Sequence, residues 1–124
     1  MGETSSKPAT VDELRAEVLA PISPKLASIA PDIGKLAMSF AYDQVWSRPG
    51  LSLRERSIAV IAALAVVNCP SELKLHALRG LANGLTKAEI GEIITQLTPY
   101  IGFPLSVTAA AAIGEVVPRA DIGD

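Results

Sequence analysis

The sequence predicts an all-α fold: a compact single domain of about six helices. Helix start and stop signals recur along the chain, including three capping boxes of the form Ser/Thr-x-x-Glu and several Pro or Gly breaks between them. No segment shows the two-residue alternation of strands flanked by hairpin turns. At 124 residues the chain can bury one core but has no room for two.

The first half of the chain is expected to hold a flexible tail followed by three helical segments. Thr10 and Glu13 form the first capping box, and Pro21 stops the helix that it opens. Pro31 suits the first position of a later helix, because its missing N–H would be unpaired there anyway. The expected segments are a tail over 1–9, a helix from 10 to about 20, a helical turn around 24–29, and a helix from 31 to about 46.

The second half is expected to hold four longer helices separated by clear breaks. Ser52 and Glu55 open one helix, and Thr86 and Glu89 open another. Gly84 can adopt the left-handed conformation that ends the helix between them. The expected helices run from 52 to about 67, from 70 to 83, from 86 to about 100 and from 104 to 116. The folded domain thus spans 10–117, and 118–124 is expected to be a frayed C-terminal tail.

Composition narrows the possible function classes. Hydrophobic residues make up 49% and charged residues 19% of the chain, so we expect apolar surface to be buried against other subunits. A net charge of −2 offers no basic field for nucleic acid. The longest run without a charge or proline, 57–69, is too short to span a membrane, and residues 1–7 lack a signal-peptide core. The single cysteine excludes an intrachain disulfide and fits a reducing compartment such as the cytoplasm.

The most informative feature is a narrow polar stripe on the helix expected over 70–83. At 100° per residue its five side chains fall within roughly 80° of one another, while the rest of the helix is almost entirely apolar. Such a helix is mostly buried, so the stripe faces either a thin strip of solvent or a polar pocket. The stripe consists of Cys69, Glu72, His76, Arg79 and Asn83.

His76, the only histidine, is the first candidate for chemistry. Glu72 lies four residues earlier, where it can fix the tautomer of the imidazole and raise its basicity. Arg79 lies three residues later, so an anion could be held beside the same ring. An ordinary series of surface ion pairs along a helix would give the same spacing, and this interpretation stays open.

Cys69 and Glu72 have the spacing of a Cys-x-x-Cys motif with a carboxylate in the second position. Dithiol redox chemistry needs a second thiol, and the chain has none. Cys69, Glu72 and His76 could touch one metal ion, but no other Cys or His completes a tetrahedral site, so no metal site is predicted. Cys69 alone is more often a small buried residue than a nucleophile.

Arginines gather around the turn before the helix expected from residue 52. Arg54 falls on the solvated first turn, whereas Arg56 heads a helix that is otherwise apolar. An arginine in a cleft needs a carboxylate partner from the protein or from a substrate, so Arg56 and Arg48 are candidates for substrate binding. No glycine-rich phosphate loop, dinucleotide fingerprint or Ser-His-Asp order is present.

Four segments, in this order and spacing, resemble the carboxymuconolactone decarboxylase family, within the alkylhydroperoxidase D-like superfamily. The resemblance covers about 31–117. The segments are 42–57 (YDQVWSRPGLSLRERS), Glu72-Leu73-x-x-His76, Asn83-Gly84-Leu85-Thr86-x-x-Glu89-Ile90-x-Glu92, and Tyr100-x-Gly102-x-Pro104.

The resemblance implies an all-helical fold, assembly into trimers or hexamers, and a cofactor-free decarboxylase. Alkylhydroperoxidase D-like relatives use a Cys-x-x-Cys pair with a histidine and a glutamate as a thiol relay. Cys69 matches the first of those cysteines and His76 the histidine, but Glu72 replaces the second cysteine. The decarboxylase branch is therefore the one that the resemblance favours.

The leading hypothesis is a carboxy-lyase that converts a carboxylated γ-lactone such as 4-carboxymuconolactone into 3-oxoadipate enol-lactone and CO₂. His76 is assigned as proton donor or enolate hydrogen-bond donor, Glu72 as its orienter, and Arg56, with Arg48 or Arg79, as carboxylate clamp. Cys69 is a further candidate for substrate binding. Three alternatives stay open: a member acting on another keto or lactone acid, a thiol-dependent peroxidase accessory using Cys69, and a non-catalytic oligomer.

Overall fold

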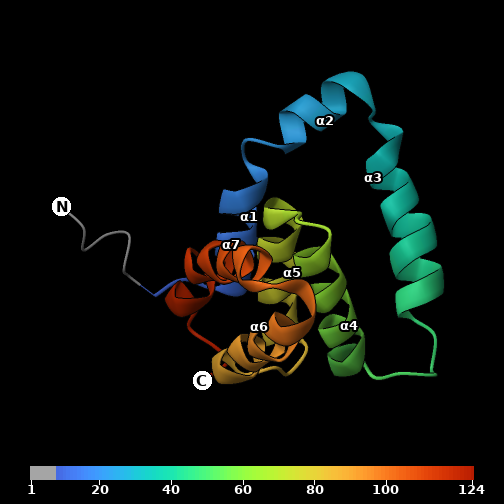
Figure 1. The fold of residues 1–124 in the computed structure, drawn as a ribbon. Helices are drawn as coiled ribbons and strands as arrows, with labels where there is room; N and C mark the ends of the chain where they lie inside the picture. The colour runs from blue at the N-terminus through green and yellow to red at the C-terminus, as the bar shows by residue number, and fades with distance from the viewer. Residues whose placement is uncertain (1–7) are drawn as a thin grey trace.

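The computed structural model describes residues 8–124, and within them the fold is entirely helical, as the sequence predicts. Figure 1 shows a bundle of helices with an arm that stands apart from it. The helices are α1 (Val11–Leu19), α2 (Ser23–Ile29), α3 (Asp32–Leu36), the π-helical η2 (Ala37–Trp46), α4 (Leu53–Val66), α5 (Pro70–Ala82), α6 (Lys87–Ile101), α7 (Phe103–Gly114) and the 3₁₀ turn η3 (Val117–Arg119).

The three predicted capping boxes are all present. The side chains of Thr10, Ser52 and Thr86 each accept a hydrogen bond from the backbone three residues later, and the glutamate there accepts one in return. These reciprocal bonds satisfy backbone donors that a helix start leaves unpaired. The starts of α1, α4 and α6 were therefore predictable from local sequence.

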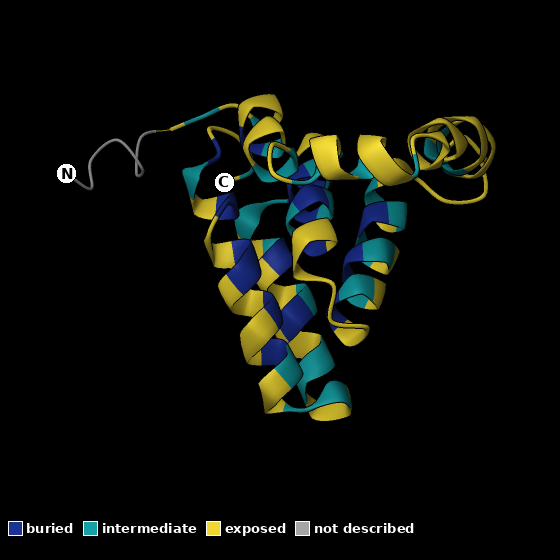
Figure 2. Cartoon of the chain, turned by 90° about the horizontal axis from the view of Figure 1, so that it is seen from above, coloured by how far each residue is buried: buried dark blue, intermediate teal, exposed yellow. Residues whose placement is uncertain are grey.

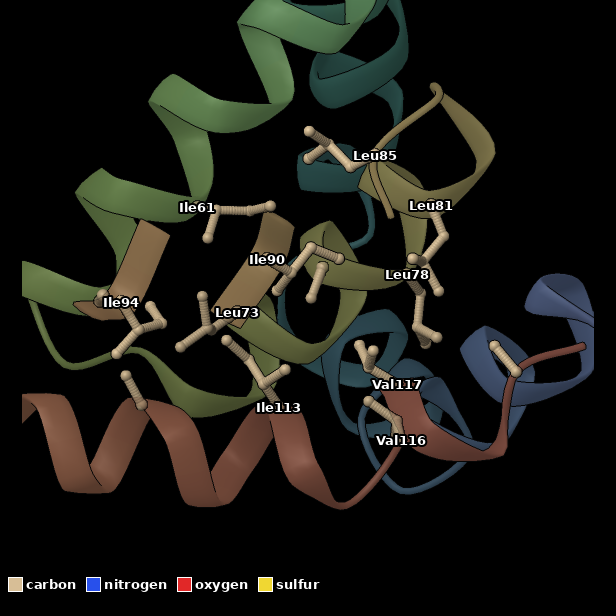
Figure 3. Close-up of a cluster of buried hydrophobic side chains, with 14 of the residues drawn as sticks. Ile61, Leu73, Leu78, Leu81, Leu85, Ile90, Ile94, Ile113, Val116 and Val117 are labelled. Carbon is tan, nitrogen blue, oxygen red and sulfur yellow. The ribbon is translucent and has the colours of Figure 1, made fainter. Parts of the chain in front are cut away.

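Helix α5 lies at the centre of the bundle, in contact with α1, α4, α6 and α7. Its predicted apolar circumference is buried, which is why it occupies this position. Figure 3 shows side chains from α4, α5, α6 and α7 pointing toward one another. The most deeply buried large residues are Leu14, Ile61, Leu73, Leu78, Leu81, Leu85 and Ile90.

Residues 23–46, here called the arm, extend away from the bundle. Figure 1 shows α2, α3 and η2 forming an arch, and Figure 2 shows that this arch is exposed along most of its length. The helix predicted from Pro31 to Trp46 exists, but it changes from α to π geometry at Ala37. No local sequence signal marked that change. Large apolar side chains of the arm, such as Leu36 and Phe40, are 62% and 61% exposed.

The C-terminal segment corrects the expectation of a frayed tail over 118–124. Ala120 is only 4% exposed, and its neighbour Asp121 donates a backbone hydrogen bond of 2.9 Å to the carbonyl of Ala9. The backbone N–H of Ala9 in turn donates a hydrogen bond of 2.9 Å to the carbonyl of Arg119. Small apolar residues let the two chain ends pack closely, which the polar ending of the sequence does not reveal. The remainder of the tail predicted over 1–9 lies mostly outside the described residues.

Across residues 8–124, no helix is both long enough and apolar enough to cross a membrane.

Candidate functional site

The arm touches the bundle through aromatic side chains that meet the polar stripe of α5. Trp46 stacks on His76, with the ring centroids 6.1 Å apart and the planes inclined by 12°. Tyr42, one turn earlier on η2, stacks on Trp46 at 5.9 Å. The guanidinium carbon of Arg79 lies 4.6 Å from the centre of the Tyr42 ring, a cation–π contact. Tyr42, Trp46, His76 and Arg79 thus form one group, here called the aromatic cluster.

The surroundings of His76 favour its neutral form. Burial, and after it the nearby positive charges of Arg79 and Arg15, together lower the pKa of this imidazole from 6.5 to about 4. Its Nδ1 is buried and has no hydrogen-bond partner among the described residues. A neutral imidazole with an unsatisfied nitrogen can still accept or donate a hydrogen bond to a ligand, depending on its tautomer.

A small cavity of about 130 Å³, lined in part by Trp46, lies between η2 and α4. Arg56 lines it, and this guanidinium donates a hydrogen bond of 2.7 Å to the backbone carbonyl of Arg48. The Nε of Arg56 is buried without a partner in the described chain. The other lining residues are apolar: Val45, Trp46, Leu51, Ala59 and Val60. Arg48 contributes its carbonyl here, while its own side chain is exposed.

The partly buried cations of residues 8–124 divide into two groups. Four have a carboxylate within 4.0 Å: Arg54 with Glu89, Lys74 with Glu115, Lys87 with Asp124, and Arg119 with Glu17. In the described chain, the three without a carboxylate partner are Arg15, Arg56 and Arg79. The positive charges of Arg15 and Arg79 lower the pKa of His76. Arg56 lines the same cavity as Trp46, and Trp46 stacks on the imidazole of His76. A partly buried guanidinium favours an anionic partner, so the surroundings of His76 are suited to binding an anion.

Two of the sequence-predicted site residues lie away from these contacts. The side chain of Glu72 is exposed, and among the described residues no hydrogen bond or ion pair links it to His76. Cys69 is an exposed free thiol at the N-cap of α5. Seven residues separate it from His76, which is about 10 Å along a helix axis. The structure therefore brings together His76, Arg79 and Arg56, and leaves Glu72 and Cys69 outside the aromatic cluster.

Asn83, the last member of the stripe, has a packing contact. Its amide donates a hydrogen bond of 2.9 Å to the hydroxyl of Ser57, a residue of α4 that is 1% exposed. This bond satisfies a buried hydroxyl and fixes the end of α5 against α4. The stripe thus contributes both to helix packing, through Asn83, and to the surroundings of His76.

Three residues of this region were not singled out for a role by sequence reasoning. Tyr42 and Trp46 lie four residues apart in the helix predicted over 31–46, a spacing that places both on one face. That spacing was the one sequence signal that could have indicated a shared role for Tyr42 and Trp46. Arg15 had no such signal, because only the packing of α1 against α5 brings it near His76.

A separate groove of about 520 Å³ lies between α1, α5 and the C-terminal segment. Its charged lining residues already pair with one another: Arg119 with Glu17 at 2.6 and 3.0 Å, and Lys74 with Glu115 at 2.9 Å. Its cations therefore each have a carboxylate partner, unlike Arg15, Arg56 and Arg79 in the region of His76. In the chain from residue 8 onward, no three His, Cys, Asp or Glu side chains lie close enough together to hold a metal ion.

Comparison with known proteins gives a family match and two curated relatives. The model of the carboxymuconolactone decarboxylase family matches residues 31–115. A 4-carboxymuconolactone decarboxylase of Acinetobacter baylyi is 38% identical over 85 residues, 68% of this chain and 63% of that protein. Nitrosuccinic acid decarboxylase npaB of Metarhizium robertsii is 32% identical over 75 residues, 60% of this chain and 52% of that protein. These matches span between half and two thirds of the relatives' lengths, and the matched range 31–115 leaves α1 outside it.

Proposed function

This chain belongs to the carboxymuconolactone decarboxylase family, and we propose that it is a cofactor-free decarboxylase. Its substrate is a carboxylated γ-lactone such as 4-carboxymuconolactone, which yields 3-oxoadipate enol-lactone and CO₂. One observation carries the proposal: a partly buried imidazole lies among guanidinium groups that have no carboxylate partner in the described chain. Both curated relatives are named as decarboxylases, which supports the same reaction class.

The reaction sets three requirements that these residues are suited to meet. When the C–C bond to the carboxylate breaks, its electron pair delocalises through the ring double bond onto the lactone carbonyl oxygen. The site must hold the carboxylate, stabilise that oxygen and return a proton to carbon. The guanidiniums of Arg56 and Arg79 are the proposed carboxylate clamps, with Arg48 as a further exposed cation at the turn after η2.

His76 is the proposed hydrogen-bond donor to the enolate oxygen. A neutral imidazole has one N–H for this purpose. An anionic substrate beside the ring opposes the effect of the guanidiniums and favours the imidazolium, which can return the proton to carbon. Glu72, one turn earlier, is the proposed orienter of His76; it takes that role only after its exposed side chain rotates toward the ring.

We further propose a homo-oligomer, a trimer or a hexamer. The exposed apolar side chains of the arm support it, because large apolar surfaces on a small protein are usually covered by a partner. A cytoplasmic location and a part in aromatic compound catabolism complete the proposal. The single cysteine fits a reducing compartment, and the relative from Acinetobacter is named for a carboxylated muconolactone.

A substrate panel tests the reaction. The protein is incubated with 4-carboxymuconolactone and with other keto and lactone acids, and products are identified by mass spectrometry together with released CO₂. The proposal expects loss of CO₂ from 4-carboxymuconolactone. Turnover of a different acid alone would support the alternative of a family member with another substrate. A folded protein that decarboxylates no acid in the panel would overturn the proposal.

A further inference from the structure

Among residues 8–124, Arg15 is the one cation of this region that comes from outside the family-matched range. It lies on α1, which packs against α5. Val11, Leu14 and Val18 define the core-facing side of α1, since Leu14 is buried and the two valines pack against the core. At 100° per residue, Arg15 falls within the same arc of roughly 100° as these three residues. Its guanidinium is thus directed to the side of α1 that faces the bundle.

The guanidinium of Arg15 has no partner among the described residues. Its Nε is buried and makes no hydrogen bond. On the same helix, Glu17 is engaged on both carboxylate oxygens by Arg119, at 2.6 and 3.0 Å. Arg56 and Arg79 at least contact a carbonyl and an aromatic ring. Arg15 therefore has the strongest unmet requirement for an anion.

We propose that Arg15 is a substrate-binding residue that holds a second anionic group of the substrate, one that the reaction does not remove. The inference rests on the proposed function. Decarboxylation consumes one carboxylate, which Arg56 or Arg79 holds. Arg15 and Arg56 lie on α1 and α4, two different helices that each pack against α5, so together they suit a ligand with two separated anionic groups. The ligand class is a dicarboxylate, as 4-carboxymuconolactone itself is, and Arg15 is the residue assigned to the carboxylate that stays.

An interaction with a group that does not react stabilises substrate and transition state alike. Its loss raises KM and leaves kcat nearly unchanged. Arg15→Gln is therefore expected to raise KM for the decarboxylated acid by about tenfold or more, since hydrogen bonds to charged groups are among the stronger ones. Arg15→Lys, which keeps the charge but not the planar fork, is expected to recover part of the loss.

A binding experiment tests the proposal without any catalytic turnover. His76 is the only histidine, so its ring NMR signals report ligand binding without ambiguity. Succinate, with two carboxylates, and butyrate, with one, are titrated into the wild type and into Arg15→Gln. The wild type is expected to bind succinate at least tenfold more tightly than butyrate. Arg15→Gln is expected to bind both with the affinity of butyrate.

Arg119→Gln is the matched control, because Arg119 also contacts α1 but through a satisfied ion pair. It is expected to keep the preference for succinate. Circular dichroism checks that each variant is folded. The proposal is overturned if the wild type shows no preference for succinate, or if Arg15→Gln keeps it. A preference that depends on Arg15, in a protein that decarboxylates no acid, would contradict the proposed function and leave the dicarboxylate site standing.

Discussion

His76 combines burial, two nearby guanidiniums and a stacked indole, and each of these affects its chemistry. Burial and positive charge both disfavour the imidazolium, so the ring is neutral near pH 7 in the absence of an anion. Trp46 covers one face of the ring and restricts its orientation. An anionic ligand is the group that would change this balance most. The free protein and the ligand-bound protein are therefore expected to differ in the protonation of this one residue.

The titration of His76 gives the first prediction. In the free protein, its ring NMR signals are expected to titrate with a midpoint near pH 4 rather than near 6.5. Unfolding restores the ordinary pKa, so between these values the unfolded chain binds a proton that the folded chain does not. This contribution lowers the free energy of unfolding as the pH falls from about 6.5 toward 4. His76→Gln is expected to lose that part of the pH dependence, and a midpoint near 6.5 would contradict this description of the site.

A second prediction at the scale of single residues concerns Cys69. Its substitution distinguishes a decarboxylase, which does not need the thiol, from the thiol-dependent peroxidase accessory, which does. Its thiol is exposed and lies two helical turns from His76. Cys69→Ser is therefore expected to keep the decarboxylation rate within about twofold, a change small on the scale of a lost catalytic group. The rate is measured as CO₂ release, with Asn68→Ser at the neighbouring position as control. Loss of activity in Cys69→Ser alone would favour a role for the thiol.

At the scale of elements, the arm is held to the bundle by few contacts. Tyr42 and Trp46 of η2 meet His76 and Arg79 of α5, while most of the remaining arm is exposed. Two residues of one helix thus engage two residues of another, each pair about one turn apart. The position of η2 and the environment of His76 consequently depend on the same aromatic contacts.

Removal of one ring tests this dependence. Trp46→Ala is expected to increase amide hydrogen exchange across 32–46 while exchange in α5, α6 and α7 stays nearly unchanged. Trp46→Phe, which keeps an aromatic ring, is the matched variant and is expected to retain most of the protection. Exchange is measured by mass spectrometry of peptides. Unchanged protection of the arm in Trp46→Ala would show that other contacts hold it.

Local sequence explains the ends of most elements but not their arrangement. The capping boxes at Thr10, Ser52 and Thr86 act within four residues, so the starts of α1, α4 and α6 were predictable. The change to π geometry at Ala37 and the packing of Ala120 have no such local signal. They depend on tertiary contacts between residues far apart in the chain.

The candidate site likewise has a part that was predictable from local sequence and a part that depends on tertiary contacts. His76 and Arg79 were predictable because helical spacing places them on one side of an otherwise apolar helix. Their contacts with Trp46 and Tyr42 join residues about thirty or more positions apart, and no helical periodicity reports such pairs. The expected contact between Glu72 and His76 has the right spacing but is not formed in the described structure. Spacing permits a contact; packing and solvation decide whether it forms.

At the scale of the whole molecule, the exposed apolar side chains predict self-association. Light scattering is expected to give a mass of three or six times the 12.9 kDa of one chain. Phe40→Asp is expected to lower that mass, because it places a charge on an exposed apolar face of the arm. Ser39→Asp, at an exposed polar neighbour, is the control and is expected to preserve the assembly. A wild-type monomer would contradict the prediction.

The central claim is that the region of His76 catalyses decarboxylation, and CO₂ release from 4-carboxymuconolactone by the wild type and His76→Ala tests it most directly. The wild type is expected to release CO₂. His76→Ala is expected to lose about 100-fold or more of the rate while keeping its helical spectrum and its oligomeric mass. A folded His76→Ala that releases CO₂ at the wild-type rate would contradict the claim.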